Sequence, residues 1–289
     1  MPKSYIAYME NKDIVQQFLA SKRVEGRSDR TLFLYKYILT RFARFLKGTS
    51  LLSATSDDIK SFLLGFREKN RSNTTMNNIR RVLNSFYAWC EEAEFLPGNP
   101  CKRVHVIKQQ KKVKYVIDDE TLELLRLGAG NIRNTAIINF LYITGVRVGE
   151  LVGLKISDVD FYDRSCIVTG KGNKQRRVYF DARTKILLDQ YLKTREDACS
   201  SLLATFRGKP QPLTIASVEH MVKTAGAAIT SNRIYPHLFR RTLATNALRK
   251  GMPVEQIQKM LGHENIETTI QYAMVAEDSM KEAHRKYIG

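Results

Sequence analysis

The chain has 289 residues, and its 47 lysines and arginines outnumber its 29 aspartates and glutamates, so the net charge is +18. No apolar run approaches the ~20 residues that cross a bilayer, and the first residues lack the apolar stretch of a signal peptide, so we expect a cytoplasmic protein with no membrane partner. A hydrophobic content of 43% excludes general disorder, and four scattered cysteines without a C-x-x-C pair argue against a zinc module or a disulfide framework.

Residues 1–96 predict a domain built from helices alone. Apolar side chains recur at helical spacing in four segments: 11–25, 30–46, the stretch from Ser56 to Phe66, and 74–94. Ser56 is the expected N-cap of the third helix, because its hydroxyl can accept a backbone N–H and two aspartates follow in the first turn.

The amino-acid composition changes after the fourth helical segment. Helix-breaking residues cluster at Leu96-Pro97-Gly98-Asn99-Pro100, and six of the thirteen residues over 102–114 are Lys or Arg. We therefore predict a basic inter-domain linker over 97–114. Its charge is compatible with a linker that lies beside a polyanion and equally with one that is merely solvated.

The rest of the chain, 115–289, predicts a mixed and mostly helical domain. Two β-prone runs, 166–169 and 177–180, flank the glycine-rich stretch Gly170-Lys171-Gly172-Asn173-Lys174, which indicates a hairpin with Lys171 near its tip. Helical segments are expected over 118–127, 132–144, 182–196, 215–229, 237–250, 254–261, 266–273 and 276–286. The segment 132–144 is so rich in apolar residues that we expect it to be buried.

The positive charge is spread over both domains. Residues 1–110 carry 19 basic and 10 acidic side chains, and residues 111–289 carry 28 and 19, so each part has a net charge of +9. Such a balance is typical of proteins that bind a polyanion, and nucleic acid is the favoured one in the absence of a membrane segment. The alternative for any single lysine or arginine is that it only solvates a helix surface.

Several segments of the second domain carry residues suited to phosphodiester chemistry, in which arginines stabilise the charge that develops on phosphate oxygens. The stretch TGVRVGEL places Arg147 directly after an apolar helix, with Glu150 three residues on. Glu150 is expected to hold the Arg147 guanidinium in place. The alternative is an ordinary Arg–Glu pair on a helix surface.

Two histidines provide candidates for proton transfer. In YPHLFR, His237 and Arg240 lie three residues apart near a helix N-terminus, where an anion is favoured, although a capping histidine and a surface arginine would give the same pattern. His263 follows the helix-ending Gly262, and Tyr272 follows nine residues later. A buried loop histidine and a core tyrosine are the alternatives for this pair. The histidines lack the H-E-x-x-H spacing of a zinc site.

The order of these motifs resembles the tyrosine recombinase (phage integrase) family, in its compact Xer-like two-domain form. The matching blocks are TGVRVGEL, TGKGNKQRRV, HLFRRTLATNALRKGMPVEQIQKMLGH and ENIETTIQY, which extend from residue 144 to residue 272. The resemblance implies a mainly α fold, with a four-helix, SAM-like core-binding domain over 1–96 and a catalytic domain over 115–289. It also implies that no further N-terminal arm-type domain precedes them.

The resemblance also implies catalytic roles for six positions, which are Arg147, Lys171, His237, Arg240, His263 and Tyr272. The two arginines would clamp the scissile phosphate, the lysine would protonate the leaving 5′ oxygen, and the tyrosine would attack to form a 3′-phosphotyrosyl bond. His237 would exchange the proton of the tyrosine, and His263 would bind a phosphate oxygen. Lys174 is an alternative for the lysine role.

The implied reaction needs no metal, cofactor or ATP. Its expected partner is duplex DNA with inverted-repeat core sites, clamped between the two domains and bound by a homotetramer or dimer of dimers, with the tail over 276–289 docking on a neighbouring protomer. One position departs from the family pattern, because Arg241 replaces a common histidine, and we expect it to add at most a phosphate contact. Two other functions stay open: a catalytically silent DNA-binding regulator on the same fold, and a strand-relaxing enzyme like the type IB topoisomerases.

Overall fold

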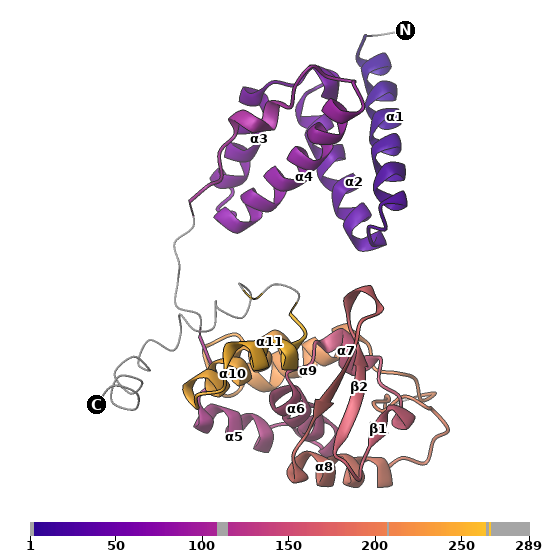
Figure 1. Ribbon diagram of the computed structural model, residues 1–289, viewed down its shortest axis with the longest axis vertical. Helices are drawn as coiled ribbons and strands as arrows, with labels where there is room; N and C mark the ends of the chain where they lie inside the picture. Colours follow the sequence, from indigo (N-terminus) through magenta and orange to yellow (C-terminus); the bar gives the residue numbers. More distant parts are fainter. Residues whose placement is uncertain (1–2, 109–114, 207, 264–265, 267–289) are drawn as a thin grey trace, which may run out of the picture. The chain divides into compact units, whose positions relative to one another are not determined.

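The computed structural model describes residues 3–108, 115–206, 208–263 and 266, without the side chains of residues 3–10 and 171. The chain divides into two compact units, Met1–Lys111 and Lys112–Gly289, and each is described here by itself (Figure 1). Within the described ranges, no helix combines the length and the apolar character needed to cross a membrane.

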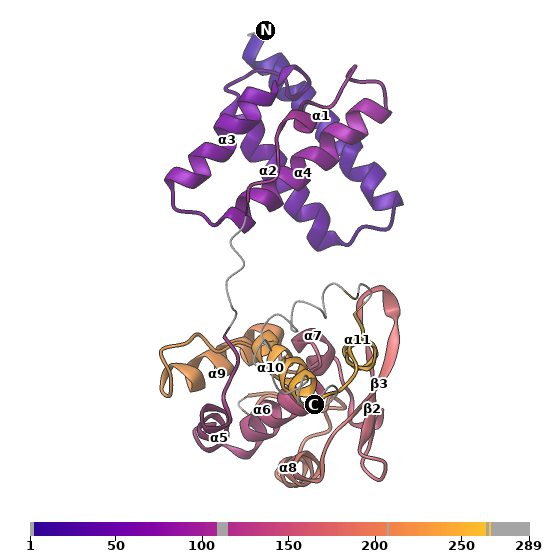
Figure 2. The ribbon, with the colours of Figure 1, turned by 60° about the vertical axis from the view of Figure 1, so that its left-hand side comes forward.

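The N-terminal unit is helical, as its sequence predicts (Figure 2). Its α-helices are α1 (Lys3–Val24), α2 (Asp29–Phe45), α3 (Ser56–Glu68) and α4 (Asn73–Glu92), with short 3-10 helices η1 (Leu51–Ser53) and η2 (Pro100–Arg103). Aromatic rings from all four α-helices lie in the core. The Phe18 and Phe86 rings pack edge-on with their centroids 5.4 Å apart, and the centroids of the Phe42 and Phe62 rings are 4.9 Å apart. The helices are thus joined by one apolar core.

The third helix begins one residue earlier than the sequence indicates. Thr55, not Ser56, is the N-cap. The Thr55 side chain accepts the Asp58 backbone N–H at 3.2 Å, and the Asp58 carboxylate accepts the Thr55 backbone N–H at 2.8 Å. This reciprocal pair satisfies two backbone donors at once, which a cap at Ser56 with no acidic partner three residues on cannot do.

The first part of the predicted linker packs into the N-terminal unit. Cys101 is 1% exposed and Val104 is 6% exposed within the core of that unit. The Asn77 side chain also binds both backbone groups of Ile107, donating to its carbonyl at 2.9 Å and accepting its N–H at 3.0 Å. Apolar residues interspersed among the lysines therefore fasten this stretch, a feature that its high charge obscured in the sequence. Residues 109–114 of the predicted linker lie outside the described residues.

The C-terminal unit combines helices with a small antiparallel sheet of strand order β1-β2-β3. Its elements are α5 (Asp119–Leu127), α6 (Ile132–Thr144), α7 (Val148–Val152), η3 (Ile156–Asp158), β1 (Val159–Asp160), β2 (Ser165–Thr169), η4 (Lys171–Asn173), β3 (Gln175–Tyr179), α8 (Ala182–Lys193), α9 (Ile215–Ala227), α10 (Pro236–Arg249) and α11 (Val254–Leu261). The predicted hairpin is confirmed, with Val168 opposite Arg176. The sequence did not indicate α7 or β1, which are too short for a periodic pattern. The helices predicted over 266–273 and 276–286 lie outside the described residues, apart from residue 266.

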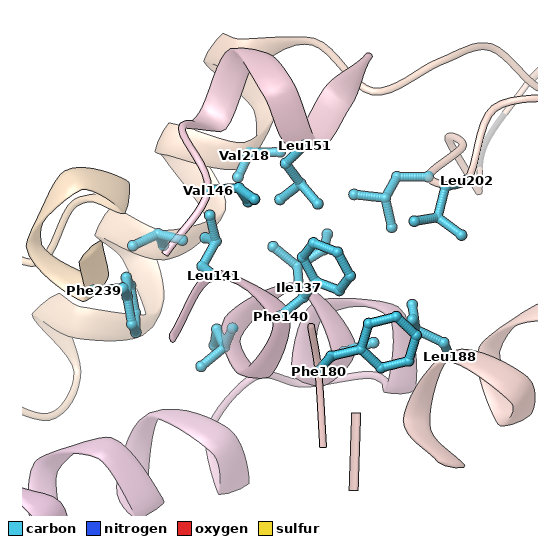
Figure 3. Packing of buried hydrophobic residues seen from close by; sticks show 14 of the residues in the cluster. Ile137, Phe140, Leu141, Val146, Leu151, Phe180, Leu188, Leu202, Val218 and Phe239 are labelled. Atoms are coloured by element: carbon cyan, nitrogen blue, oxygen red, sulfur yellow. The ribbon is translucent and has the colours of Figure 1, made fainter. Parts of the chain in front are cut away.

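Helix α6 lies at the centre of this unit (Figure 3). Its residues 136–141 are all buried, as the apolar sequence predicts, because other elements surround the helix. Ile137 and Phe140 project from α6 toward Leu151 of α7 and Phe180 after β3 (Figure 3). The candidate site residues begin at the C-terminal end of this buried helix.

Candidate active site

A glycine at the end of α6 lets three helices approach one another. Gly145 has φ +61°, a left-handed conformation that glycine adopts without strain. A Cβ atom at this position would lie 2.8 Å from a methyl group of Leu243 in α10 and 2.9 Å from one of Leu261 in α11. A larger residue would therefore strain the backbone at this turn and displace these two leucine side chains.

Arg240 is buried where these helices meet, with 1% of its surface exposed. Its Nη1 atom donates to the Gly145 carbonyl at 2.6 Å, and its Nη2 atom donates to the Leu261 carbonyl. The guanidinium thus binds backbone oxygens at the C-terminal ends of α6 and α11, where helix dipoles favour a cation. The alternative of a surface arginine is wrong.

Arg147 and Glu150 form the expected pair, but they are buried unequally. The Glu150 carboxylate accepts the Arg147 backbone N–H at 2.8 Å and its Nη1 at 2.9 Å. The Glu150 side chain is 4% exposed, whereas the Arg147 side chain is 42% exposed. A surface ion pair would expose both side chains, so this buried carboxylate instead supports a guanidinium that reaches the surface.

Arg176 of β3 completes this arrangement, although the sequence reasoning did not single it out. Its Nη1 and Nη2 atoms donate to the two oxygens of Glu150, each at 2.8 Å, and its Nε donates to the Met260 carbonyl at 3.1 Å. Burial raises the pKa of Glu150, but the hydrogen bonds and charge of Arg176 and the hydrogen bonds of Arg147 outweigh it and lower the pKa to about 2. Arg176 is 26 residues from Glu150 in sequence, so no local spacing could have revealed the pair.

The hairpin turn between β2 and β3 lies against the same ion pair. The Gly170 N–H donates to the Lys174 carbonyl at 2.8 Å, which closes the turn. A Cβ atom on Gly170 would lie 3.1 Å from a Glu150 carboxylate oxygen, so glycine permits this close approach. Lys171 begins the η4 turn, but its side chain is outside the described structure. The backbone of this turn at Gly170 therefore lies close to both Glu150 and Arg147.

Helix α11, which ends two residues before His263, lies beside the β3 edge of the sheet (Figure 2). Gly262 ends the helix with φ +63°, and the His263 backbone binds Gln258 through its N–H at 3.1 Å and its carbonyl at 3.0 Å. Burial lowers the pKa of His263 to about 4, and the charge of Arg240 and then that of Arg147 contribute to the shift. His263 is thus a buried loop histidine that is neutral near pH 7 and lies close to both arginines.

His237 lies in the first turn of α10, behind Pro236 at the helix start as predicted. It is exposed, one helical turn from the buried Arg240. Its charge is among those that lower the pKa of His263. The two histidines and the arginine therefore act on one another electrostatically at the same site.

Arg241 has a different environment from the one we expected. It is 9% exposed, and it donates to the Tyr115 carbonyl at 3.2 Å and to the Tyr235 hydroxyl at 2.8 Å. The adjacent Thr242 hydroxyl accepts the Ile117 N–H at 3.1 Å. Arg241 therefore fastens the start of the C-terminal unit to α10, and the expectation of a phosphate contact has no support in this geometry.

The site as described is strongly cationic. Arg147, Arg176, Arg240 and His263 converge on the end of α11, and the buried Glu150 is the acidic group that binds two of these arginines. Among the described residues, no group of three His, Cys, Asp or Glu side chains could hold a metal ion. Such a cluster of guanidinium groups is suited to binding phosphate oxygens. Tyr272 lies outside the described residues.

Sequence comparison identifies relatives of both units. Residues 103–279 match the phage integrase family, and residues 14–95 match the N-terminal SAM-like domain of phage integrases. The chain is 33% identical to the tyrosine recombinase XerA of Pyrococcus horikoshii, over 96% of this chain and 94% of the relative. It is 29% identical to the tyrosine recombinase XerC of Pediococcus pentosaceus, over 96% and 98%.

Solved structures show the same fold. A XerA recombinase crystal structure superposes with a TM-score of 0.55 at 25% identity, covering 97% of this chain and 99% of that one. A lambda integrase dimer bound to a COC′ core site gives a TM-score of 0.75 at 18% identity, with coverage of 90% and 76%. With matches of this extent, the chain belongs to the phage integrase family of tyrosine recombinases, site-specific enzymes that cleave and rejoin DNA.

Proposed function

We propose that this chain cleaves duplex DNA through a 3′-phosphotyrosyl intermediate, without metal, cofactor or ATP, and then rejoins it to exchange strands. The observation that carries the proposal is the convergence of Arg147, Arg240 and the neutral His263 at the end of α11. These are three of the six positions to which the family pattern assigns catalysis. The other three are Lys171, His237 and Tyr272.

Arg147 and Arg240 clamp the scissile phosphate in this mechanism. Negative charge grows on the non-bridging oxygens as the phosphorus is attacked, and fixed guanidinium groups stabilise that charge. The buried hydrogen bonds of Arg240 fix one fork in advance, and Glu150 fixes the other. His263 donates an imidazole N–H to a phosphate oxygen, which its neutral form can do.

Tyr272 is the nucleophile, and its hydroxyl loses a proton to His237 as it attacks. A free tyrosine has a pKa of about 10, so the surrounding cations and this base are needed near neutral pH. The new bond joins the tyrosine oxygen to phosphorus, the bond from phosphorus to the 5′ oxygen breaks, and Lys171 protonates that oxygen. The attack of a 5′ hydroxyl on the phosphotyrosine reverses these steps, so one phosphodiester is exchanged for another and no ATP is consumed.

The expected partners are duplex DNA with inverted-repeat core sites and further copies of this chain. Relatives of the same fold have been solved as a lambda integrase dimer on a core site and as a lambda integrase tetramer on a Holliday junction. We infer a homotetramer or dimer of dimers on DNA, in the cytoplasm, with the tail over 276–289 docked on a neighbouring protomer. Deleting 276–289 should then impair assembly on DNA while single-protomer binding is retained, and unchanged tetramer formation would contradict the tail assignment.

A suicide substrate tests the central claim. The chain first selects bound duplexes from a pool with random core sequences, and the selected duplexes are then nicked next to the expected cleavage position. The parent should form an adduct that survives denaturant, and Tyr272→Phe should bind the same DNA without forming it. Binding without an adduct would favour the silent regulator. Relaxation of supercoiled DNA without strand exchange would favour the topoisomerase-like enzyme.

The lysine role has its own test, with Lys174→Ala as the matched variant. Lys171→Ala should slow cleavage of the normal substrate, and a 5′-bridging thiolate, which leaves without a proton, should restore the rate. If the thiolate substrate instead restores the cleavage rate of Lys174→Ala, the proton donor is Lys174.

A further inference from the structure

One side chain joins three segments of the active site. Arg176 extends from β3, the strand that follows the hairpin turn with Lys171. Its two terminal nitrogens bind Glu150 of α7, and its Nε binds the Met260 carbonyl near the end of α11. Only 12% of the side chain is exposed. A side chain enclosed in this way can set the relative positions of the segments it binds.

The contact of Arg176 with Glu150 affects how strongly that carboxylate attracts Arg147. Oε1 of Glu150 accepts Nη1 of Arg147 at 2.9 Å and Nη1 of Arg176 at 2.8 Å, so the two guanidinium groups share one oxygen. A buried carboxylate needs compensating donors. Without Arg176, Glu150 would keep Arg147 as its remaining arginine partner. The carboxylate would then draw the Arg147 guanidinium inward, away from a phosphate.

The contact with α11 acts on the other side of the site. Arg176 holds the Met260 carbonyl at 3.1 Å, three residues before His263. Its stem also lies against Gly262, where a Cβ atom would come within 3.0 Å of the Arg176 Cδ. The end of α11 therefore packs against the Arg176 side chain, and the backbone turn that leads to His263 begins at this contact.

We propose that Arg176 is a positioning residue for strand cleavage: it holds Glu150 and the end of α11 so that Arg147 and His263 meet the scissile phosphate together. The inference rests on the proposed function and adds a residue to its machinery. Arg176 does not touch the phosphate in this account. It acts through Arg147 and through the backbone of α11.

Two variants of Arg176 and one of its neighbour test the assignment, with adduct formation measured on the nicked duplex at saturating protein. Arg176→Met should slow cleavage about 100-fold, because small misplacements of reacting groups cost that much. Arg176→Lys keeps a charge but not the fork, and should slow it about 10-fold. Arg177→Met is the matched control, because Arg177 is adjacent on β3 and binds Asp163 and Ser165 instead. It should cleave at the parent rate, as should both Arg176 variants if the inference is wrong.

A second substitution distinguishes positioning from a loss of folding. In Glu150→Gln/Arg176→Met, the neutral amide no longer draws Arg147 inward, so the double variant should cleave about 10-fold faster than Arg176→Met alone. A double variant that is as slow or slower would overturn the link through Glu150. Thermal unfolding identifies variants that are not folded at the assay temperature, and Arg176→Lys then decides the question.

The thiolate substrate separates Arg176 from the proton donor. Because Arg176 acts through Arg147 and His263, a 5′-bridging thiolate should not restore the rate of Arg176→Met, and restoration would overturn the assignment. The parent is run alongside throughout. If the parent forms no adduct, the proposed function fails, whereas equal rates for parent and variants contradict only the role of Arg176.

Discussion

The two units bury polar groups of different kinds. Among the described residues, the buried polar side chains of the N-terminal unit are Asn11, Asn77 and Asn99, all neutral. The C-terminal unit buries the charged or ionisable Glu150, Arg240, Arg241 and His263, besides neutral groups. Buried charges must be paired and hydrogen-bonded to be tolerated. The contrast indicates that the first interior serves folding, while the second also carries the chemistry.

The asparagines show what a purely structural polar group does. Asn11 accepts the Leu51 N–H at 2.6 Å and donates to the Thr49 carbonyl at 3.2 Å. It thereby satisfies two backbone groups between the end of α2 and the start of η1. The Arg240 side chain also binds backbone oxygens, but it brings a full charge into the interior. A neutral donor could satisfy those oxygens as well, so hydrogen bonding alone does not explain the charge, which the dipoles of α6 and α11 favour.

The comparison predicts its largest effect at Arg240. Arg240→Met should slow adduct formation about 100- to 1000-fold, as for other single donors that stabilise transition-state charge. The measurement is the single-turnover cleavage rate at saturating protein. In the N-terminal unit, the exposed Arg81 donates to Asn78, and Arg81→Met should weaken DNA binding most at low salt and reduce the salt dependence of binding, without changing that rate. Equal effects on cleavage would remove the distinction between the units.

The next largest difference between the units should be the effect on folding stability of removing an ion pair. Glu150→Ala leaves the nearly buried Arg176 without its carboxylate, and should destabilise the C-terminal unit by about 3 kcal/mol. Denaturant unfolding measures the change. Glu91→Ala is the matched variant, because Glu91 pairs with the 66%-exposed Lys102 on the surface of the N-terminal unit, and it should leave the unfolding midpoint nearly unchanged. A large effect at Glu91 alone would reverse the comparison.

A smaller effect is expected at the helix cap of the N-terminal unit. Thr55→Ala removes the acceptor for the Asp58 N–H and should lower the free energy of unfolding by about 1 kcal/mol. Ser56→Ala is the control for the sequence-based assignment and should change it less. The cleavage rate of both variants at saturating protein should equal that of the parent, since the cap lies outside the catalytic unit.

The last expected effect is a pH dependence of folding stability from His263. Its pKa is lowered from 6.5 to about 4 in the folded chain, so between these values the unfolded chain binds a proton that the folded chain does not. Folding stability should therefore fall as the pH is lowered through this window. His263→Gln should reduce that fall in melting temperature, whereas the same change at the exposed His105 should retain it. No difference between the two variants would contradict the burial of His263.

Local patterns predicted most of the helices and the hairpin. Apolar periodicity located α2, α4, α6 and the hairpin strands to within a few residues, because each pattern lies within one element. The short α7 and β1 were missed, since five and two residues are too few to show a period. Arg176 and Arg241 were not identified as partners of Glu150 and Tyr115, because their contacts cross 26 and 126 residues of chain.

The sequence by itself determined the family and its six candidate catalytic positions, because motif order is a property of the chain. It also indicated that Gly262 ends a helix, and in the structure both Gly262 and Gly145 end helices in a left-handed conformation that other residues rarely adopt. Only the tertiary structure decided which charges are buried and what holds them. Those contacts join the ends of α6, α7, α11 and β3, and they exist only once the folded core brings these ends together.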